Sequence, residues 1–122
     1  MSADPSVTAV GGTQFKPNYD ENSNDVGFTA ESVWDESNLG ATGGGVSEIF
    51  SKPTYQNGST PADGKRDVPD VAMIASPDAP GAIVVLDFDG QAQIGCCIGG
   101  TSLSAPVFAG VAKLLEQKLG AF

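Results

Sequence analysis

The chain has 122 residues, enough for one domain or a piece of one, and this length argues against a second domain. Fifteen Asp and Glu against six Lys and Arg give a formal net charge of -9 at pH 7, which excludes nucleic-acid binding because no basic surface could neutralise a phosphate backbone. The same balance is compatible with a protein that works at low pH. No stretch reaches the roughly 18 apolar residues of a membrane span, and the N-terminus lacks the basic and apolar regions of a signal peptide.

The first part of the chain predicts short strands separated by polar loops. Residues 6–10 are expected to form a short buried strand that ends at the following pair of glycines, and residues 18–25 an exposed loop. Residues 28–34 alternate weakly, which predicts a second strand. Trp34, the only tryptophan, is expected in the core because of its bulk.

The middle of the chain combines a glycine triplet, a long loop and a hairpin. Residues 43–45 lack the Lys-Ser or Lys-Thr of a phosphate loop, so they are expected to serve close backbone approach. Residues 57–67 carry Asn-Gly and Asp-Gly turns and predict a surface loop. Residues 70–75 then predict a buried strand, with Asp70 expected to bond backbone groups at its start. Residues 82–95 predict a β-hairpin around an Asp-Gly turn.

Cys96 and Cys97 are adjacent and are the only cysteines. Neighbouring cysteines can bridge only through a strained eight-membered ring, so two free buried thiols are expected, with a bridge to a cysteine outside the chain as the alternative. The absence of histidine and of a second cysteine pair argues against a metal site.

The most informative segment is residues 99–106, with the sequence GGTSLSAP, which opens a long apolar stretch. Residues 103–119 have apolar side chains at helical spacing and small or apolar residues nearly all round, which predicts a long buried helix. Ser102 would then lie at the helix N-terminus, where unpaired N–H groups and the helix dipole stabilise developing negative charge. This placement favours a nucleophile, although Ser102 or Thr101 could instead cap the helix.

Four stretches resemble the sedolisins, or serine-carboxyl peptidases, which share the subtilisin fold, and the lack of histidine favours this family over a subtilisin-type triad. The stretches are GGTSLSAPVFAGVAKLL from residue 99, PSVTAVGGT from residue 5, residues 31–56 with ESVWDE, TGGGVS and FSKPTYQ, and VPDVA from residue 68.

The resemblance implies that residues 1–122 are the central, nucleophile-bearing part of a peptidase catalytic domain. It implies an α/β fold, a partial subtilisin-like architecture with a largely parallel sheet, the β-hairpin and the long buried C-terminal helix. Ser102 would be the catalytic nucleophile, and its own backbone N–H would donate to the oxyanion. The catalytic glutamate, its aspartate partner and the oxyanion aspartate of the family find no match here. The family's calcium site would lie beyond Phe122, so no cofactor is expected within the chain.

The function expected from this resemblance is acid-acting serine-type endopeptidase chemistry, with the chain inactive on its own because its base is elsewhere. One alternative is a non-catalytic remnant that binds peptides or a partner, and another is a minimal hydrolase with an internal carboxylate base. The expected partners are a protein or peptide substrate and the missing parts of the catalytic domain, without nucleic acid or membrane. Secretion or another extracytoplasmic location is implied by the resemblance.

Overall fold

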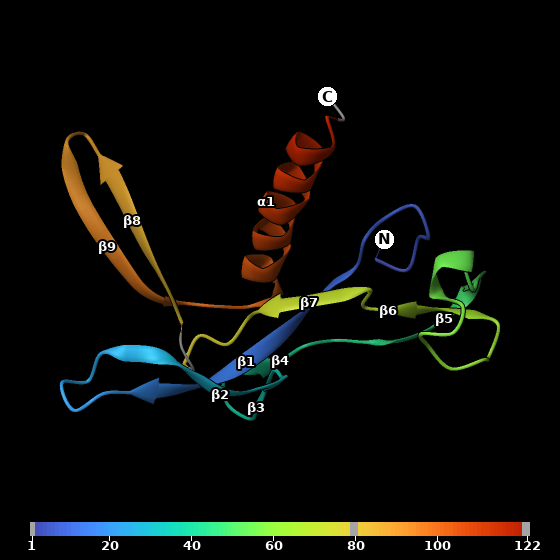
Figure 1. Ribbon diagram of the computed structural model, residues 1–122, viewed down its shortest axis with the longest axis horizontal. Helices are drawn as coiled ribbons and strands as arrows, with labels where there is room; N and C mark the ends of the chain where they lie inside the picture. Colours follow the sequence, from blue (N-terminus) through green and yellow to red (C-terminus); the bar gives the residue numbers. More distant parts are fainter. Residues whose placement is uncertain (1, 79–80, 121–122) are drawn as a thin grey trace.

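The computed structural model of the chain describes residues 2–78 and 81–120 (Figure 1). Its elements, in chain order, are β1 (Val10–Tyr19), β2 (Asp25–Val33), β3 (Asp35–Glu36), β4 (Gly40–Ala41), β5 (Gly45–Ser51), the 3-10 helix η1 (Thr54–Gln56), β6 (Lys65–Val68), β7 (Val71–Ile74), β8 (Ala82–Phe88), β9 (Gln91–Ile98) and α1 (Thr101–Leu119).

The central sheet has three strands in the order β2-β1-β7. Strand β1 pairs with β2 in antiparallel fashion and with β7 in parallel, from Val10 opposite Val71 to Thr13 opposite Ile74. The prediction of a largely parallel sheet is therefore wrong, since β1–β7 is the one parallel pair among the described strands and the other pairs are antiparallel hairpins or short ladders. Antiparallel strands need only short connections, as between β1 and β2 and between β8 and β9.

Strand β1 begins where the sequence predicted a strand to end. The strand expected at residues 6–10 is wrong, because β1 starts at Val10 and runs through Gly11 and Gly12 to Tyr19. Gly12 pairs with Met73 inside the sheet, and glycine fits there because an added Cβ would lie 2.5 Å from the Ala75 Cβ and 3.2 Å from the Trp34 ring. The exposed loop is accordingly shorter than predicted and occupies residues 20–24.

The hydrophobic core is small. Its buried apolar side chains are Ala9, Trp34 and Ala75, so the expectation for Trp34 is confirmed. The indole N–H of Trp34 donates to Glu36 Oε2 at 3.0 Å, which satisfies the polar end of this side chain.

Residues 57–67 are only partly the surface loop that their turn residues predicted. They end in strand β6, and Arg66 of that strand is completely buried. Arg66 is buried because its guanidinium donates to the Asp70 carboxylate and to the backbone carbonyl of Val7, which lies far from the loop in sequence.

Helix α1 spans the predicted region, but most of its surface is exposed. It rises from the sheet and contacts β1 and β7 at one side only (Figure 1). Leu114 is 67% exposed and Leu119 79% exposed, so the predicted burial of this helix is wrong for the chain as described. The reason is geometric: no layer of the described residues covers its other faces.

The β8–β9 hairpin is confirmed and extends away from the sheet (Figure 1). Between the pairs formed by Ala82 with Ile98 and by Val84 with Gly95, β9 contributes two residues, Cys96 and Cys97, against one on β8. The prediction of two free buried thiols is wrong, since both side chains are exposed and bonded to each other. Neighbouring side chains of a regular strand point to opposite faces, and the bulge, with a φ of 63° at Cys97, interrupts that alternation.

Candidate active site

The segment that leads into α1, residues 99–104, is called the Ser102 turn below. It begins against the end of β7, where the N–H of Gly100 donates to the Ala75 carbonyl at 2.6 Å. A Cβ on Gly99 would lie 2.5 Å from that same Ala75 oxygen and from the Pro77 nitrogen. Glycine at position 99 therefore permits the close approach that fixes the start of the turn.

The first turn of α1 has no side-chain cap. Its N-cap is Gly100, with φ 98° and ψ 161°. The alternative that Ser102 or Thr101 caps the helix is therefore wrong. Ser102 instead lies within the first turn, with an exposed side chain, and neither its hydroxyl nor its N–H makes a hydrogen bond within the described part of the chain.

The hydroxyl and the backbone N–H of Ser102 both lie beside Gly100, the N-cap residue of the helix. A Cβ built on Gly100 would lie 3.2 Å from Ser102 Oγ and 3.9 Å from Ser102 N, and glycine leaves that position empty. The unpaired N–H groups and the positive end of the helix dipole lie beside it. An oxygen that acquires negative charge there would receive a ready hydrogen-bond donor next to a hydroxyl nucleophile.

A second serine of the turn has a different environment. Ser104 is completely buried, and its hydroxyl donates to the Ile74 carbonyl at 2.9 Å, with the Met73 carbonyl at 3.1 Å. Pro106 has no N–H and cannot bond the carbonyl of Ser102, four residues earlier in the helix. Bonds to β7 therefore hold the start of α1 in place of a full set of helical bonds. Sequence reasoning missed Ser104, although its spacing from Ser102 could have indicated an inward-facing partner.

No carboxylate of the described residues hydrogen-bonds to Ser102. The carboxylate closest in its chemistry to a serine base is Glu36, whose Oε1 accepts from the Ser76 hydroxyl at 2.6 Å while its Oε2 accepts from Trp34. Ser76 is completely buried and its hydroxyl also accepts from the Asp78 N–H, so this pair joins elements of the fold. An internal base for Ser102 thus has no support in these contacts.

A cavity of about 430 Å³ adjoins the Ser102 turn through Thr101. The glycine triplet of residues 43–45 and Pro69 form much of its wall. The expectation that this triplet serves close approach is met at Gly44, where an added Cβ would lie 3.1 Å from the Val68 carbonyl. Uncharged residues therefore line this space beside the helix start.

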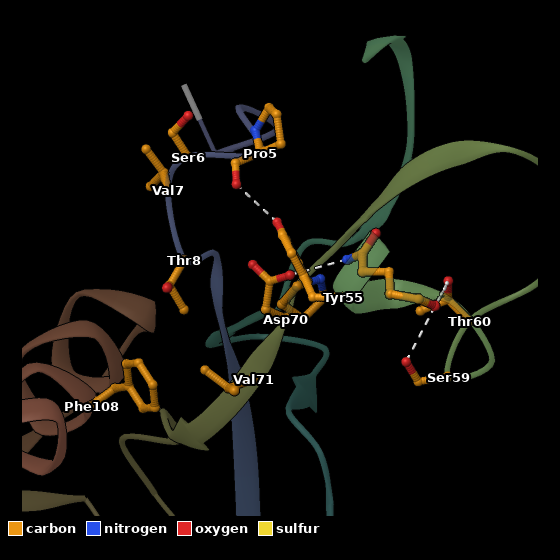
Figure 2. Close-up of a pocket in the computed structure, with 12 residues that line it drawn as sticks. Pro5, Ser6, Val7, Thr8, Tyr55, Ser59, Thr60, Asp70, Val71 and Phe108 are labelled. Atoms are coloured by element: carbon orange, nitrogen blue, oxygen red, sulfur yellow. Dashed lines mark hydrogen bonds between the residues drawn. The ribbon is translucent and has the colours of Figure 1, made fainter. Parts of the chain in front are cut away.

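A larger cavity, about 600 Å³, lies against Asp70, and Ser102 is not among its lining residues. Figure 2 shows Asp70 between Tyr55, whose hydroxyl donates to the Pro5 carbonyl at 3.0 Å, and Val71, with Phe108 of α1 on the opposite wall. Asp70 bonds backbone at the start of its strand, as predicted, by accepting from the Ala9 N–H at 2.8 Å.

The buried partner of Asp70 was not predicted. Arg66 donates to both carboxylate oxygens at 2.6 Å, and Gln56 adds a bond at 3.0 Å. Burial alone would raise the pKa of Asp70, but the hydrogen bonds from Arg66 and from the Ala9 N–H outweigh it and lower that pKa below its ordinary value. The same pairing raises the pKa of Arg66. The carboxylate is thus held ionised, and both of its oxygens already accept hydrogen bonds. These features fit a structural role better than a role as a general acid or base.

Within residues 2–78 and 81–120, no three His, Cys, Asp or Glu side chains group so as to hold a metal ion. The calcium site implied by the resemblance stays a prediction for sequence outside the chain. No described helix is long and apolar enough to cross a membrane.

Comparison with known proteins connects this turn to one family. No family model matches the chain. Kumamolisin from Bacillus sp. (strain MN-32) is 39% identical over 98% of the chain, and sedolisin from Pseudomonas sp. (strain 101) is 36% identical over 95% of it. The chain spans about a fifth of the length of these relatives, 21% and 19% respectively.

A solved structure gives the same result for the fold. Pseudomonas sedolisin, a serine-carboxyl proteinase complexed with pseudo-iodotyrostatin, matches 98% of the chain with a TM-score of 0.71 and 34% sequence identity, over 31% of the sedolisin chain. Similarity of sequence and fold agree over nearly the whole chain, and the chain therefore belongs to the sedolisin family.

Proposed function

We propose that this chain supplies the nucleophile of an acid-acting serine-type endopeptidase, with Ser102 as the attacking residue. The observation that carries the proposal is the exposed Ser102, whose Oγ and backbone N both lie beside Gly100 on a turn anchored to the end of β7. The relationship to a serine-carboxyl proteinase supports it.

In the proposed reaction, Ser102 Oγ forms a bond to the carbonyl carbon of a peptide while its proton passes to a glutamate outside the chain. The carbonyl oxygen becomes negative and accepts a hydrogen bond from the Ser102 N–H. The glutamate then gives the proton to the leaving amine, and water repeats the sequence to release the acyl group. A carboxylate base stays ionised down to about pH 4, which places activity in the acid range.

The exposed apolar surface of the chain indicates where the part of the domain that carries the glutamate base would pack. Leu114, Leu115 and Leu119 of α1 and Ile94 of the hairpin are each more than half exposed. We infer that the remaining parts of the catalytic domain cover these faces and bring the glutamate to Ser102. A secreted or otherwise extracytoplasmic location belongs to the same proposal, as do a protein or peptide substrate and a calcium site outside the chain.

The same surface favours one second candidate, a non-catalytic remnant that binds peptides or a partner protein. Such a module would use its apolar faces and sheet edges without needing Ser102. Only the peptidase function requires the Ser102 hydroxyl, so removing this hydroxyl distinguishes the two candidates.

The test is a chimera in which this chain replaces the matching segment of kumamolisin. We expect the chimera to hydrolyse a mixed peptide library at about pH 4, and the Ser102→Ala variant to lose at least about a thousandfold in kcat. Ser37→Ala, an exposed serine in a loop, is the matched control and should keep full activity. The isolated chain should be inactive at the same pH.

Two results would contradict the proposal. One is a Ser102→Ala chimera that keeps its activity. The other is a chimera with the circular dichroism and thermal melting of kumamolisin that cleaves nothing, and this second result would favour the binding module.

A further inference from the structure

We propose that Ser104 is a positioning residue that sets the Ser102 turn against the end of β7. The inference rests on the proposed function, because positioning has a catalytic meaning only if Ser102 is the nucleophile. Its structural part stands independently, on the bonds between the turn and the sheet.

The hydroxyl of Ser104 donates to a carbonyl outside its own helix. A serine in a helix commonly bonds the carbonyl of its own helix four residues earlier, which here would be Gly100. That carbonyl already accepts from the Leu103 N–H at 2.9 Å. Ser104 instead reaches the carbonyls of Ile74 and Met73 on a different element. Because the side chain is completely buried, this bond satisfies a group that would otherwise be costly to bury.

Two bonds to consecutive carbonyls of the β7 end flank Ser102. On its N-terminal side Gly100 N–H donates to Ala75 O at 2.6 Å, and on its C-terminal side Ser104 Oγ donates to Ile74 O at 2.9 Å. β7 ends at Ile74 and is the edge strand of its sheet, and Ala75 lies just beyond it. No other described strand pairs with the outer side of β7, which leaves this end of the strand accessible to the Ser102 turn. The turn is therefore fixed at two points rather than one.

The first turn of α1 has fewer backbone hydrogen bonds of its own than a regular helix to hold Ser102. Pro106 cannot donate to the Ser102 carbonyl, so one bond of the first helical turn is absent. With the Ser104 hydroxyl removed, the turn would keep only the Gly100 bond and could pivot about it. A small displacement of a nucleophile relative to its substrate costs up to about a hundredfold in rate.

The first measurement is amide hydrogen exchange in the chain as it stands, comparing Ser104→Ala with the parent. We expect exchange at Gly100 and Leu103 to accelerate at least about tenfold, while amides in the β1–β2 ladder keep their rates. Ser104→Cys, which keeps the shape of the side chain with a slightly larger atom but donates weakly, should change the same amides in the same direction. It also keeps the test decisive if the alanine variant unfolds. Unchanged exchange in either folded variant would overturn the proposal.

The second measurement is kinetic, in the kumamolisin chimera. Ser104→Ala should lower kcat about tenfold or more at unchanged KM. Gln56→Ala is the control for lost stability alone, since Gln56 is buried and hydrogen-bonded to Asp67 and Asp70 but not to the turn. It should lower the melting temperature and leave kcat unchanged below that temperature.

The two measurements separate this proposal from the proposed function. An inactive parent chimera would contradict the function, while the exchange data would still decide whether Ser104 holds the turn. Faster exchange combined with an unchanged kcat would show that Ser104 serves stability only, and would overturn its positioning role.

Discussion

Arg66 and Asp70 place a charged pair inside a small fold, and their surroundings explain how the chain tolerates it. The guanidinium donates to both carboxylate oxygens, and its second nitrogen also reaches the Val7 carbonyl at 3.3 Å. Asp70 in turn accepts from the Ala9 N–H. The pair therefore ties the segment before β1 to β6 and β7, which sets where β1 enters the sheet.

The pair predicts a pH dependence of stability. The pKa of Asp70 in the folded chain lies below its ordinary value of 3.8, so its contribution is fully present above that value and is lost as the pH falls through the folded pKa. Asp70→Asn leaves the buried guanidinium without a counter-charge and should destabilise the chain by about 3 kcal/mol at pH 6. The difference should shrink as the pH falls below 3.8 toward the lowered pKa of the folded carboxylate, because the wild-type carboxylate then becomes protonated.

Urea unfolding of both proteins from pH 6 to pH 2.5 measures this difference. Asp35→Asn removes an exposed carboxylate and is the control, expected to change stability by less than about 0.5 kcal/mol. A deficit for Asp70→Asn that stays constant over the whole pH range would contradict the assignment.

The sequence could predict Asp70 but not its partner. The position of Asp70 between a proline and an apolar run is local information, and it indicated a backbone-bonded carboxylate. Arg66 follows an Asp-Gly turn, a local signal of exposure, and its burial depends on contacts with residues as distant as Val7. Ser104 was missed for the same reason, because its acceptors lie about 30 residues earlier. Ser102 could be located because a helix start is visible in sequence.

At the scale of elements, the packing of β1 on β7 depends on a missing side chain. An added Cβ at Gly12 would lie 2.5 Å from the Ala75 Cβ, which is closer than such atoms approach. Gly12→Ala should therefore destabilise the chain by about 1 to 3 kcal/mol, since the sheet must shift to make room. Gly43→Ala is a matched control, because open space surrounds that position, and it should be neutral or slightly stabilising.

Thermal melting of both variants measures the difference. Equal melting temperatures for Gly12→Ala and the parent would show that β1 and β7 do not pack as described.

Element types were easier to predict from sequence than their limits and neighbours. The hairpin of β8 and β9 and the helix α1 follow from a turn dipeptide and an apolar period. The start of β1 was wrong because a glycine pair signals both a turn and close packing, and only the partner strand distinguishes the two. Strand order and the antiparallel pairing of β1 with β2 depend on contacts that no local pattern contains.

At the scale of the whole molecule, the chain exposes more surface than its mass accounts for. A compact monomer of this mass exposes about 6,100 Å². This chain, at 12.4 kDa, exposes 8469 Å², including large apolar side chains on both α1 and the hairpin. A helix that is apolar nearly all round is typically buried by other layers. The surface therefore supports the inference that further parts of a catalytic domain pack here.

This inference predicts that one substitution has opposite consequences in two contexts. Leu114 is 67% exposed, so Leu114→Glu should change the stability of the isolated chain by less than about 0.5 kcal/mol. In the kumamolisin chimera the same leucine would be buried, and a buried unpaired charge should cost several kcal/mol and abolish peptidase activity. Gln117→Glu adds the same charge at an exposed polar position of α1 and should be tolerated in both. Melting temperatures of all six proteins provide the comparison. If Leu114→Glu is tolerated in an active chimera, that face of the helix has no covering layer and the partner must dock elsewhere.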